Sequence, residues 1–198
     1  TFAMYGIIAQ GLGLKCVPVA LNEEWDFSAT AFLETISEHK PKIIFFSFPN
    51  NPTGNCFNRE AIQQILSSFD GIVVLDEAYY DFARSSFLDE LKHHNNLIIL
   101  RSLSKIGLAA LRVGYGIAAP EIIHEIDKVR LPYNSNAISQ TFSNIVLSDY
   151  DKVETQIDHI IAERNRLMGE LKKISGVTPF RSDSNFILFR NDTGTINL

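Results

Sequence analysis

Residues 42–54 read KIIFFSFPNNPTG, a continuous apolar run that passes directly into a turn rich in Pro, Asn and Gly. A short apolar run bounded by turn residues is typical of a β-strand buried on both faces, as in a parallel sheet. Two similar runs come later in the chain, GIVVLD at 71–76 and LIILR at 97–101. We therefore predict a sheet built around these three segments.

The segments around these strands predict an α/β protein. Ser28 and Asn58 are good N-cap residues, each followed by apolar residues at helical spacing. The other elements that we expect are a helix at 4–12, a short strand at 15–20, a helix at 29–38, a helix after Asn58 and a strand at 113–118. Strands that alternate with helix-length segments indicate a mostly parallel sheet covered by helices on both faces.

The composition is that of an ordinary globular protein. The chain has 198 residues, of which 45% are hydrophobic and 11% aromatic, and a formal net charge of -5. This mild acidity argues against nucleic acid as the main partner, because phosphate binders usually carry a basic excess. There is no apolar run of membrane-spanning length and no signal-peptide pattern. Cys16 and Cys56 lack metal-ligand spacing, so we expect a reduced, cytoplasmic protein without a metal site.

The pattern changes near residue 149. A long amphipathic helix is predicted over 149–174, ended by Gly176, and residues 186–189 (FILF) are typical of a strand. We therefore expect one domain over 1–148, and over 149–198 a linking helix with the beginning of a smaller α+β domain. Because the chain starts at Thr1 without a Met and stops soon after this strand, we expect it to be a piece of a longer protein.

Polar side chains follow each of the three buried strands. Asn51 lies in the turn after the first strand, Asp76 and Tyr79 follow the second, and Ser102 and Lys105 follow the third. In a parallel α/β sheet, ligands bind beyond the carboxyl ends of the strands. We therefore expect these side chains to converge on one crevice, although each motif alone is only a weak signal.

Together these motifs resemble those of the class I/II aminotransferases, enzymes of fold type I that depend on pyridoxal 5'-phosphate (PLP). The matching segments are NNPTG at 50–54, DEAY at 76–79 and SLSKIGLAALRVGY at 102–115. The resemblance runs across essentially the whole chain and is strongest to histidinol-phosphate aminotransferases. It implies that residues 1–148 are most of the PLP-binding large domain.

The resemblance implies a role for each polar residue at the strand ends. Lys105 would bond covalently to the cofactor, and its freed amine would move the proton during transamination. Asp76 would pair with the ring nitrogen, so that the ring withdraws electrons from the substrate. Asn51 and Tyr79 would hydrogen-bond the phenolic oxygen of the ring. Tyr80 is expected to pack rather than to take part in the chemistry.

The same resemblance assigns the outer parts of the site. Ser102, Ser104 and Arg112 would bind the phosphate, with Arg112 as the charged fork. Phe2 would stack on the cofactor ring. For Ser104 the alternative is a helix cap, and for Phe2 it is ordinary core packing. Substrate contacts are implied for Tyr133, Asn134 and Asn185, although residues 131–134 could equally form a turn between domains.

The implied reaction is transfer of the amino group from L-histidinol phosphate to 2-oxoglutarate. An aromatic amino-acid aminotransferase and a threonine-phosphate decarboxylase are alternatives, because they share the PLP residues. A non-enzymatic alternative is the effector-sensing domain of a transcription regulator, which should follow a DNA-binding segment. A further alternative, a degenerate fragment that only dimerises, conflicts with the retention of Lys105, Asp76, Tyr79 and Arg112.

Complete members of the family carry three further elements that these 198 residues lack. They are an upstream Gly-rich loop for the phosphate, a Tyr from the other subunit and a C-terminal Arg for the substrate carboxylate. The resemblance therefore implies a homodimer with active sites at the subunit interface. We expect the 198-residue chain alone to bind PLP weakly and to transaminate little or not at all.

Overall fold

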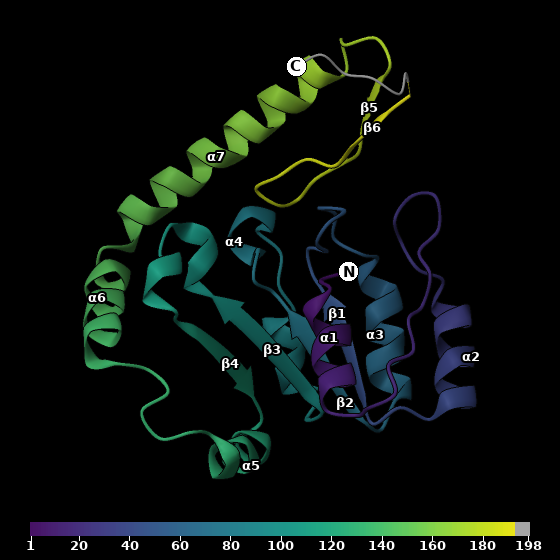
Figure 1. Ribbon diagram of the computed structural model, residues 1–198, viewed down its shortest axis with the longest axis vertical. Coiled ribbons are helices and arrows are strands. Elements are labelled where there is room, and N and C mark those ends of the chain that lie inside the picture. Colours follow the sequence, from purple (N-terminus) through teal and green to yellow (C-terminus); the bar gives the residue numbers. More distant parts are fainter. Residues whose placement is uncertain (193–198) are drawn as a thin grey trace.

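The structure is a computed structural model that describes residues 1–192, and its centre is a four-stranded sheet (Figure 1). The strands lie in the order β1 (Ile43–Ser47), β2 (Ile72–Asp76), β3 (Leu97–Ser102) and β4 (Gly114–Ala118). The first three are parallel, with Phe45 opposite Val74, and β4 runs antiparallel to β3. The predicted α/β class with a mostly parallel sheet is confirmed. Residues 193–198 of the expected second domain lie outside the described part.

One face of the sheet is covered by α2 (Ala29–His39) and α3 (Arg59–Ser68). Both helices begin where the sequence predicts, because the Ser28 and Asn58 side chains accept hydrogen bonds from the amides of Ala31 and Ala61. The apolar side chains between the helices and the sheet form the main core, whose fully buried members include Phe48, Ile62, Ile65, Val73, Leu75, Phe87, Leu97 and Ile99.

The opposite face of β1 is only partly covered. Helix α1 (Met4–Gly11) lies over it, and Tyr5 stacks on Phe45 with ring centroids 5.0 Å apart. Ile43 nevertheless remains 52% exposed and Phe45 44% exposed. The prediction that this strand is buried on both faces is therefore wrong, because burial depends on what lies over a face and the strand's own residues do not specify that.

Residues 15–20 do not form the predicted strand. They run as irregular chain between α1 and α2, and Pro18 lies at their centre. Since Pro has no backbone N–H to donate, it weakens any pairing of such a short segment with a sheet. The apolar residues around Pro18 therefore do not form a strand.

Short helical segments connect the remaining strands. Helix α4 (Tyr80–Ala83) and the 3-10 segment Leu88–Lys92 follow β2, and the 3-10 segments Leu103–Ile106 and Ala109–Leu111 lie between β3 and β4. Beyond β4 come α5 (Pro120–Val129) and α6 (Ala137–Ser148), which the sequence analysis did not predict. No helix within residues 1–192 is both long enough and apolar enough to cross a membrane.

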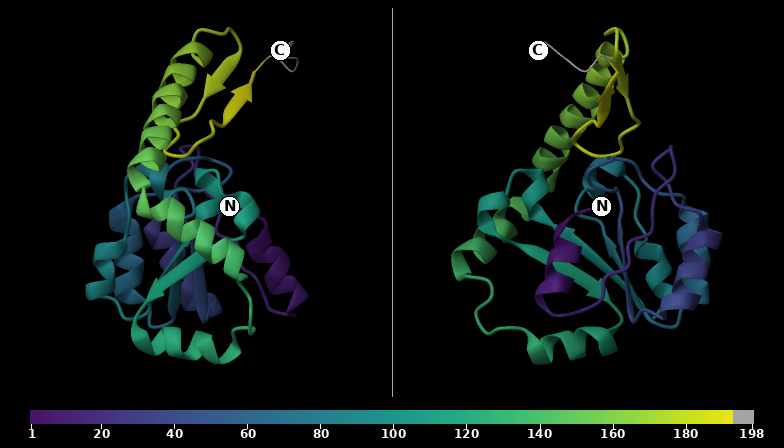
Figure 2. Two further views of the ribbon diagram at one scale, coloured as in Figure 1. Left: turned by 90° about the vertical axis from the view of Figure 1, so that its left-hand side faces the viewer. Right: turned by 45° about the vertical axis from the view of Figure 1, so that its right-hand side comes forward.

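Helix α7 (Tyr150–Leu171) projects away from the sheet and carries the hairpin of β5 (Val177–Pro179) and β6 (Phe189–Asn191) (Figure 2). Its first turns are fastened to α4: the Tyr150 hydroxyl donates to Asp81 at 2.6 Å, and Arg84 pairs with Glu154 and Asp158. The predicted long helix is thus confirmed.

The predicted strand at 186–189 is wrong in its position. The strand begins only at Phe189, because Phe186 turns inward and packs edge-on against Tyr79, with ring centroids 5.3 Å apart. The backbone oxygen of Phe186 accepts a hydrogen bond from the Ser182 hydroxyl. The Phe186 side chain therefore packs against the sheet domain at Tyr79 and does not take part in the hairpin.

Candidate active site

The carboxyl ends of β1, β2 and β3 meet at the edge of the sheet that faces α4 and α7 (Figure 1). The turn with Asn51 comes after β1, Asp76 is the last residue of β2, and Lys105 lies after β3 in the 3-10 segment. Because the three strands are parallel, their ends lie next to one another. The sheet thus brings these predicted site residues to the same edge.

Asn51, Tyr79 and Lys105 form the centre of this edge. The Asn51 side-chain amide donates to the Tyr79 hydroxyl at 3.3 Å, and the Lys105 Nζ lies 5.0 Å from the centroid of the Tyr79 ring. Tyr79 is buried, whereas Asn51 and Lys105 are half-buried. An amide, a phenol and a primary amine are thus held together at the rim of the apolar core.

Asp76 is held by a partner that sequence reasoning missed. The Tyr5 hydroxyl donates to Asp76 Oδ2 at 2.5 Å, and the amide of Ala78 donates to Oδ1 at 3.0 Å. Burial, and then the charge of Asp76, raise the pKa of the Tyr5 hydroxyl far above its usual value of 10. Tyr5 therefore stays a proton donor to the carboxylate. Its position one helical turn after Phe2 is the signal that could have found it.

The turn that carries Asn51 is fixed by the distant segment 182–186. Gly54 adopts a φ of +84°, and a Cβ at this position would lie 2.9 Å from the Ser182 hydroxyl oxygen. The backbone amide of Asp183 donates a hydrogen bond to the Gly54 oxygen at 2.7 Å. The Asp183 side-chain carboxylate accepts a hydrogen bond from the amide of Cys56 at 2.9 Å. Both the left-handed backbone and the close approach require Gly54.

The predicted phosphate ligands are not assembled. Ser102 caps the 3-10 segment by accepting a hydrogen bond from the Ser104 amide at 3.1 Å, so the capping hydroxyl belongs to Ser102 and not to Ser104. Arg112 is exposed, with a φ of 55°, and its guanidinium donates to the backbone oxygen of Ala109 at 3.1 Å. Within residues 1–192, the Arg112 guanidinium makes no hydrogen bond to either serine.

Phe2 lies at the margin of the site. Its ring is 43% exposed and packs edge-on against Tyr5, with centroids 5.6 Å apart. Phe2 is therefore not part of the core, which was the alternative to a stacking role. It contacts the residue that holds Asp76, and its exposed surface leaves room for a ligand.

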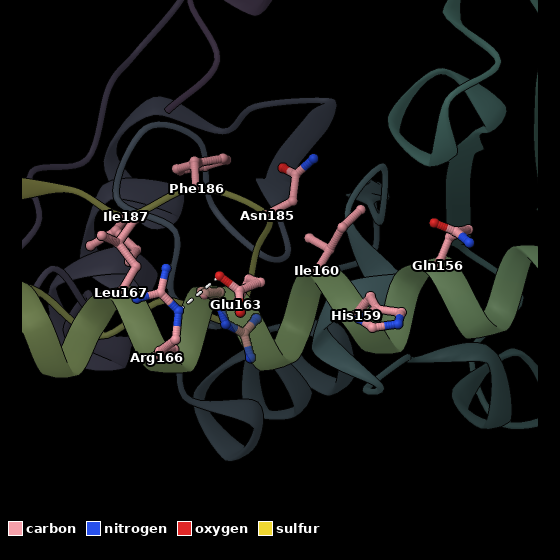
Figure 3. Close-up of a pocket in the computed structure, with 10 residues that line it drawn as sticks. Gln156, His159, Ile160, Glu163, Arg166, Leu167, Asn185, Phe186 and Ile187 are labelled. Carbon is pink, nitrogen blue, oxygen red and sulfur yellow. Dashed lines mark hydrogen bonds and ion pairs between the residues drawn. The ribbon is translucent and has the colours of Figure 1, made fainter.

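The predicted substrate residues lie on two other segments of the chain. Tyr133 is 99% exposed with a φ of 58°, and Asn134 accepts a hydrogen bond from Arg130 at 3.3 Å in the loop between α5 and α6. Asn185 lines a groove of about 350 Å³ between α7 and residues 185–187 (Figure 3). Neither Lys105 nor Asp76 lines this groove, but Phe186, the neighbour of Asn185, packs against Tyr79 of the strand-end cluster.

Metal ligation is not indicated in the part of the chain that the structure describes. Within residues 1–192, no group of three or more His, Cys, Asp or Glu side chains is arranged to hold a metal ion. The groups that the strand-end cluster offers to a ligand are a carboxylate, a phenol, an amide and an amine.

A mostly parallel sheet that brings Asp76, the Asn51–Tyr79 pair and Lys105 to one edge is the arrangement expected of an α/β protein of the PLP-transferase class. The sequence model of the family "Aminotransferase class I and II" matches residues 1–194. The chain therefore belongs to the class I and II aminotransferase family, as the motifs predicted.

Individual relatives agree with this assignment. The chain is 43% identical over 190 residues to a histidinol-phosphate aminotransferase of Neisseria meningitidis serogroup B. This alignment covers 96% of the chain and 52% of that protein. The chain is 40% identical to the corresponding protein of Vesicomyosocius okutanii, covering 96% of the chain and 54% of that protein. The chain thus spans about half the length of the curated relatives it matches.

Solved structures show the same fold. The histidinol-phosphate aminotransferase of Clostridium acetobutylicum superposes with a TM-score of 0.90 at 28% sequence identity, covering 98% of the chain and 60% of that structure. The fold-type I architecture predicted from the motifs is therefore confirmed.

Proposed function

We propose that the full-length protein is a PLP-dependent aminotransferase that transfers the amino group of L-histidinol phosphate to 2-oxoglutarate. The observation that carries the proposal is the convergence of Asp76, Asn51, Tyr79 and Lys105 on one edge of the sheet. Relatives named histidinol-phosphate aminotransferase, at 40–43% identity, support the choice of substrate. Within this proposal, residues 1–148 form the large domain and 149–198 begin the small one.

The residues at the strand ends fit PLP. Asp76 offers a carboxylate for the ring nitrogen, with Tyr5 holding one of its oxygens in place. The paired Asn51 and Tyr79 side chains offer donors for the phenolic oxygen. Lys105 offers the amine that binds the cofactor's aldehyde carbon. When bound, PLP supplies the electron-withdrawing ring that stabilises negative charge at the substrate Cα.

Each side chain then has a separate task. The Asp76 carboxylate holds a proton on the ring nitrogen, because a negative charge beside that nitrogen favours its protonated form. The Lys105 Nζ would take the proton from the substrate Cα and carry it toward the cofactor. Asn51 and Tyr79 orient the ring through its oxygen. Ser102, Ser104 and Arg112 bind the phosphate, and Phe2 packs on the ring face.

The substrate and partner assignments belong to the same proposal. Tyr133, Asn134 and Asn185 contact substrate, and the full-length protein is a cytoplasmic homodimer with its active sites at the subunit interface. Exposed apolar side chains on α6, at Ile138, Phe142 and Ile145, support association of subunits, since 55–73% of each remains accessible. An aromatic amino-acid aminotransferase or a threonine-phosphate decarboxylase would use the same strand-end residues.

The proposal is tested with the full-length protein and PLP. We expect a visible absorbance band from lysine-bound cofactor, and borohydride reduction followed by peptide mass spectrometry should place the label on Lys105. A panel of amino donors should then show the highest kcat/KM for L-histidinol phosphate. A label scattered over exposed lysines would overturn the cofactor assignment, whereas a preference for aromatic amino acids would overturn only the substrate.

A further inference from the structure

A buried ion pair lies directly behind the strand ends. The Glu77 side chain is fully buried and that of Arg101 is only 10% exposed, and the Arg101 NH2 lies 3.0 Å from Glu77 Oε2. Most of the other ion pairs in residues 1–192 lie between exposed side chains, such as Lys173 with Glu170 at the C-terminal end of α7. Removing two charges from water is costly, so such a pair needs good geometry and further hydrogen bonds to persist.

Both oxygens of Glu77 are occupied. The Ser86 hydroxyl and the amide of Phe87 donate to Oε1 at 3.0 and 2.6 Å. The Arg101 Nε and NH2 both donate to Oε2, at 3.1 and 3.0 Å. The Arg101 NH2 also donates to the Ser86 oxygen at 2.8 Å. The carboxylate is therefore held in a single orientation.

The Arg101 guanidinium is held by its surroundings as well. Its Cζ lies 3.6 Å from the centroid of the Tyr80 ring, and Tyr115 on β4 is its cross-strand neighbour. Burial alone would lower the pKa of the Arg101 guanidinium. The hydrogen bonds to Glu77 and the negative charge of Glu77 outweigh this effect, so the pKa of Arg101 is raised. A planar guanidinium stacked on an aromatic ring is a role that lysine cannot fill.

The position of the pair in the sequence connects it to the candidate site. Glu77 directly follows Asp76, and Arg101 directly precedes Ser102 and lies one short segment before Lys105. The amide of Glu77 also donates to the Leu100 oxygen at 2.8 Å. The ion pair therefore ties the end of β2, which carries Asp76, to the end of β3, which leads to Lys105.

We propose that Glu77 and Arg101 are positioning residues that fix the separation and orientation of Asp76 relative to Lys105 without touching the cofactor themselves. This inference rests on the proposed function, because it assigns the pair to the same PLP site. The pair has no net charge, so its removal should change the electrostatic potential at the site little. A change in the behaviour of the bound cofactor would then report a change in geometry.

The test uses the full-length protein reconstituted with PLP. The double variant Glu77→Gln, Arg101→Met removes the pair without leaving an unpaired buried charge, and Arg101→Lys keeps the charge but loses the fork. We expect the Kd for PLP to rise ~10-fold or more in both, the effect typical of partners that orient a ligand-binding residue. We also expect the pH midpoint of the lysine-bound absorbance band to shift by about 0.5 or more.

The matched control makes the same chemical change at the exposed pair at the C-terminal end of α7, as Glu170→Gln, Lys173→Met, and should alter neither quantity. If wild-type protein forms no band on Lys105, the proposed function and this inference both fall. If wild type forms the band and Arg101→Lys, which keeps a charged partner for Glu77, leaves the Kd and pH midpoint unchanged, the inference alone is overturned. An equal shift in the control would overturn it as well.

Discussion

The two ends of the proposed cofactor site differ in how much of their geometry the protein itself fixes. At the ring end, Asp76 is held by Tyr5 and the Ala78 amide, and Tyr79 is buried against Phe186 and bonded to Asn51. At the phosphate end, Arg112 is exposed and its guanidinium donates to the Ala109 oxygen, and Ser102 serves as a cap. The ring end lies at the ends of buried strands, whereas the phosphate end lies on short helical segments at the surface.

In the proposed site, the ring end is formed before a ligand binds, whereas the phosphate end would be completed by the ligand. Side chains fixed before binding lose little entropy on binding, so they act at full strength from the start. An exposed guanidinium must be ordered by the anion that it binds. Substitutions at the ring end should therefore affect turnover, and substitutions at the phosphate end should affect affinity.

The largest effect is expected for Lys105→Ala. Without this amine, the ring end has no group to bond the cofactor or move the proton, and loss of a positioned acid–base group costs ~10²–10⁴-fold in rate. Steady-state transamination and the visible absorbance band measure both losses. Lys15→Ala, at an exposed lysine, should behave as wild type. A Lys105→Ala protein with wild-type turnover would place the chemistry elsewhere.

Asp76→Asn should have the next largest effect. The substitution keeps the shape and still accepts the hydrogen bond from Tyr5, but it removes the negative charge that holds the ring nitrogen protonated. We expect kcat to fall by ~10²-fold, the size of effect seen when one preorganised electrostatic partner is removed. PLP affinity should change less than kcat. Asp70→Asn, at an exposed position, is the control. An unchanged kcat would separate Asp76 from the cofactor.

Arg112→Gln tests the phosphate end. We expect the Kd for PLP to rise ~10-fold or more, because a hydrogen bond between ionised groups contributes ~1.5–3 kcal/mol. Since Arg112 is exposed, the stability of the PLP-free protein should change by less than about 0.5 kcal/mol. PLP titration and denaturant unfolding measure the two quantities. A large loss of stability without PLP would mean that Arg112 has a structural role instead.

Tyr5→Phe should have an effect of the same order as Arg112→Gln, measured on the stability of the PLP-free protein. We expect the PLP-free protein to lose ~1.5–3 kcal/mol at pH 7, because a hydrogen bond to the Asp76 carboxylate is removed. The pKa of Tyr5 is raised above the unfolded value of 10, so its stabilising contribution is complete below pH 10 and falls as the pH rises further. Denaturant unfolding from pH 7 to 11 should show the wild-type advantage shrinking above pH 10. A constant difference across this range would contradict the raised pKa.

Local sequence patterns predicted most of the sheet and the strand ends at which the candidate residues lie. The strands at 72–76 and 97–102 are short apolar runs, and the order of the chain fixes which residues come at the end of each, so Asp76 and Lys105 were placed at the correct edge. The caps at Ser28 and Asn58 depend only on neighbouring residues, and both were correct. These features have in common that their physical cause lies within a few residues.

The errors arose where the cause lies far along the chain. The exposed face of β1 depends on what covers it, and the late start of β6 depends on Phe186 packing against Tyr79. Tyr5 was missed because its partner Asp76 lies 71 residues away. Sequence periodicity contains no information on such contacts. The pairing of Glu77 with Arg101 was missed for the same reason.

The clasp between Gly54 and residues 182–183 also bears on the order in which the protein folds. The hydrogen bond from the Cys56 amide to Asp183 joins residues 127 positions apart in the chain. Closing so long a loop costs entropy before any contact forms, and contacts of high sequence separation are the slow ones in folding. We therefore expect the turn that presents Asn51 to acquire its last support only after α7 and the hairpin have docked, later than the strand ends beside it.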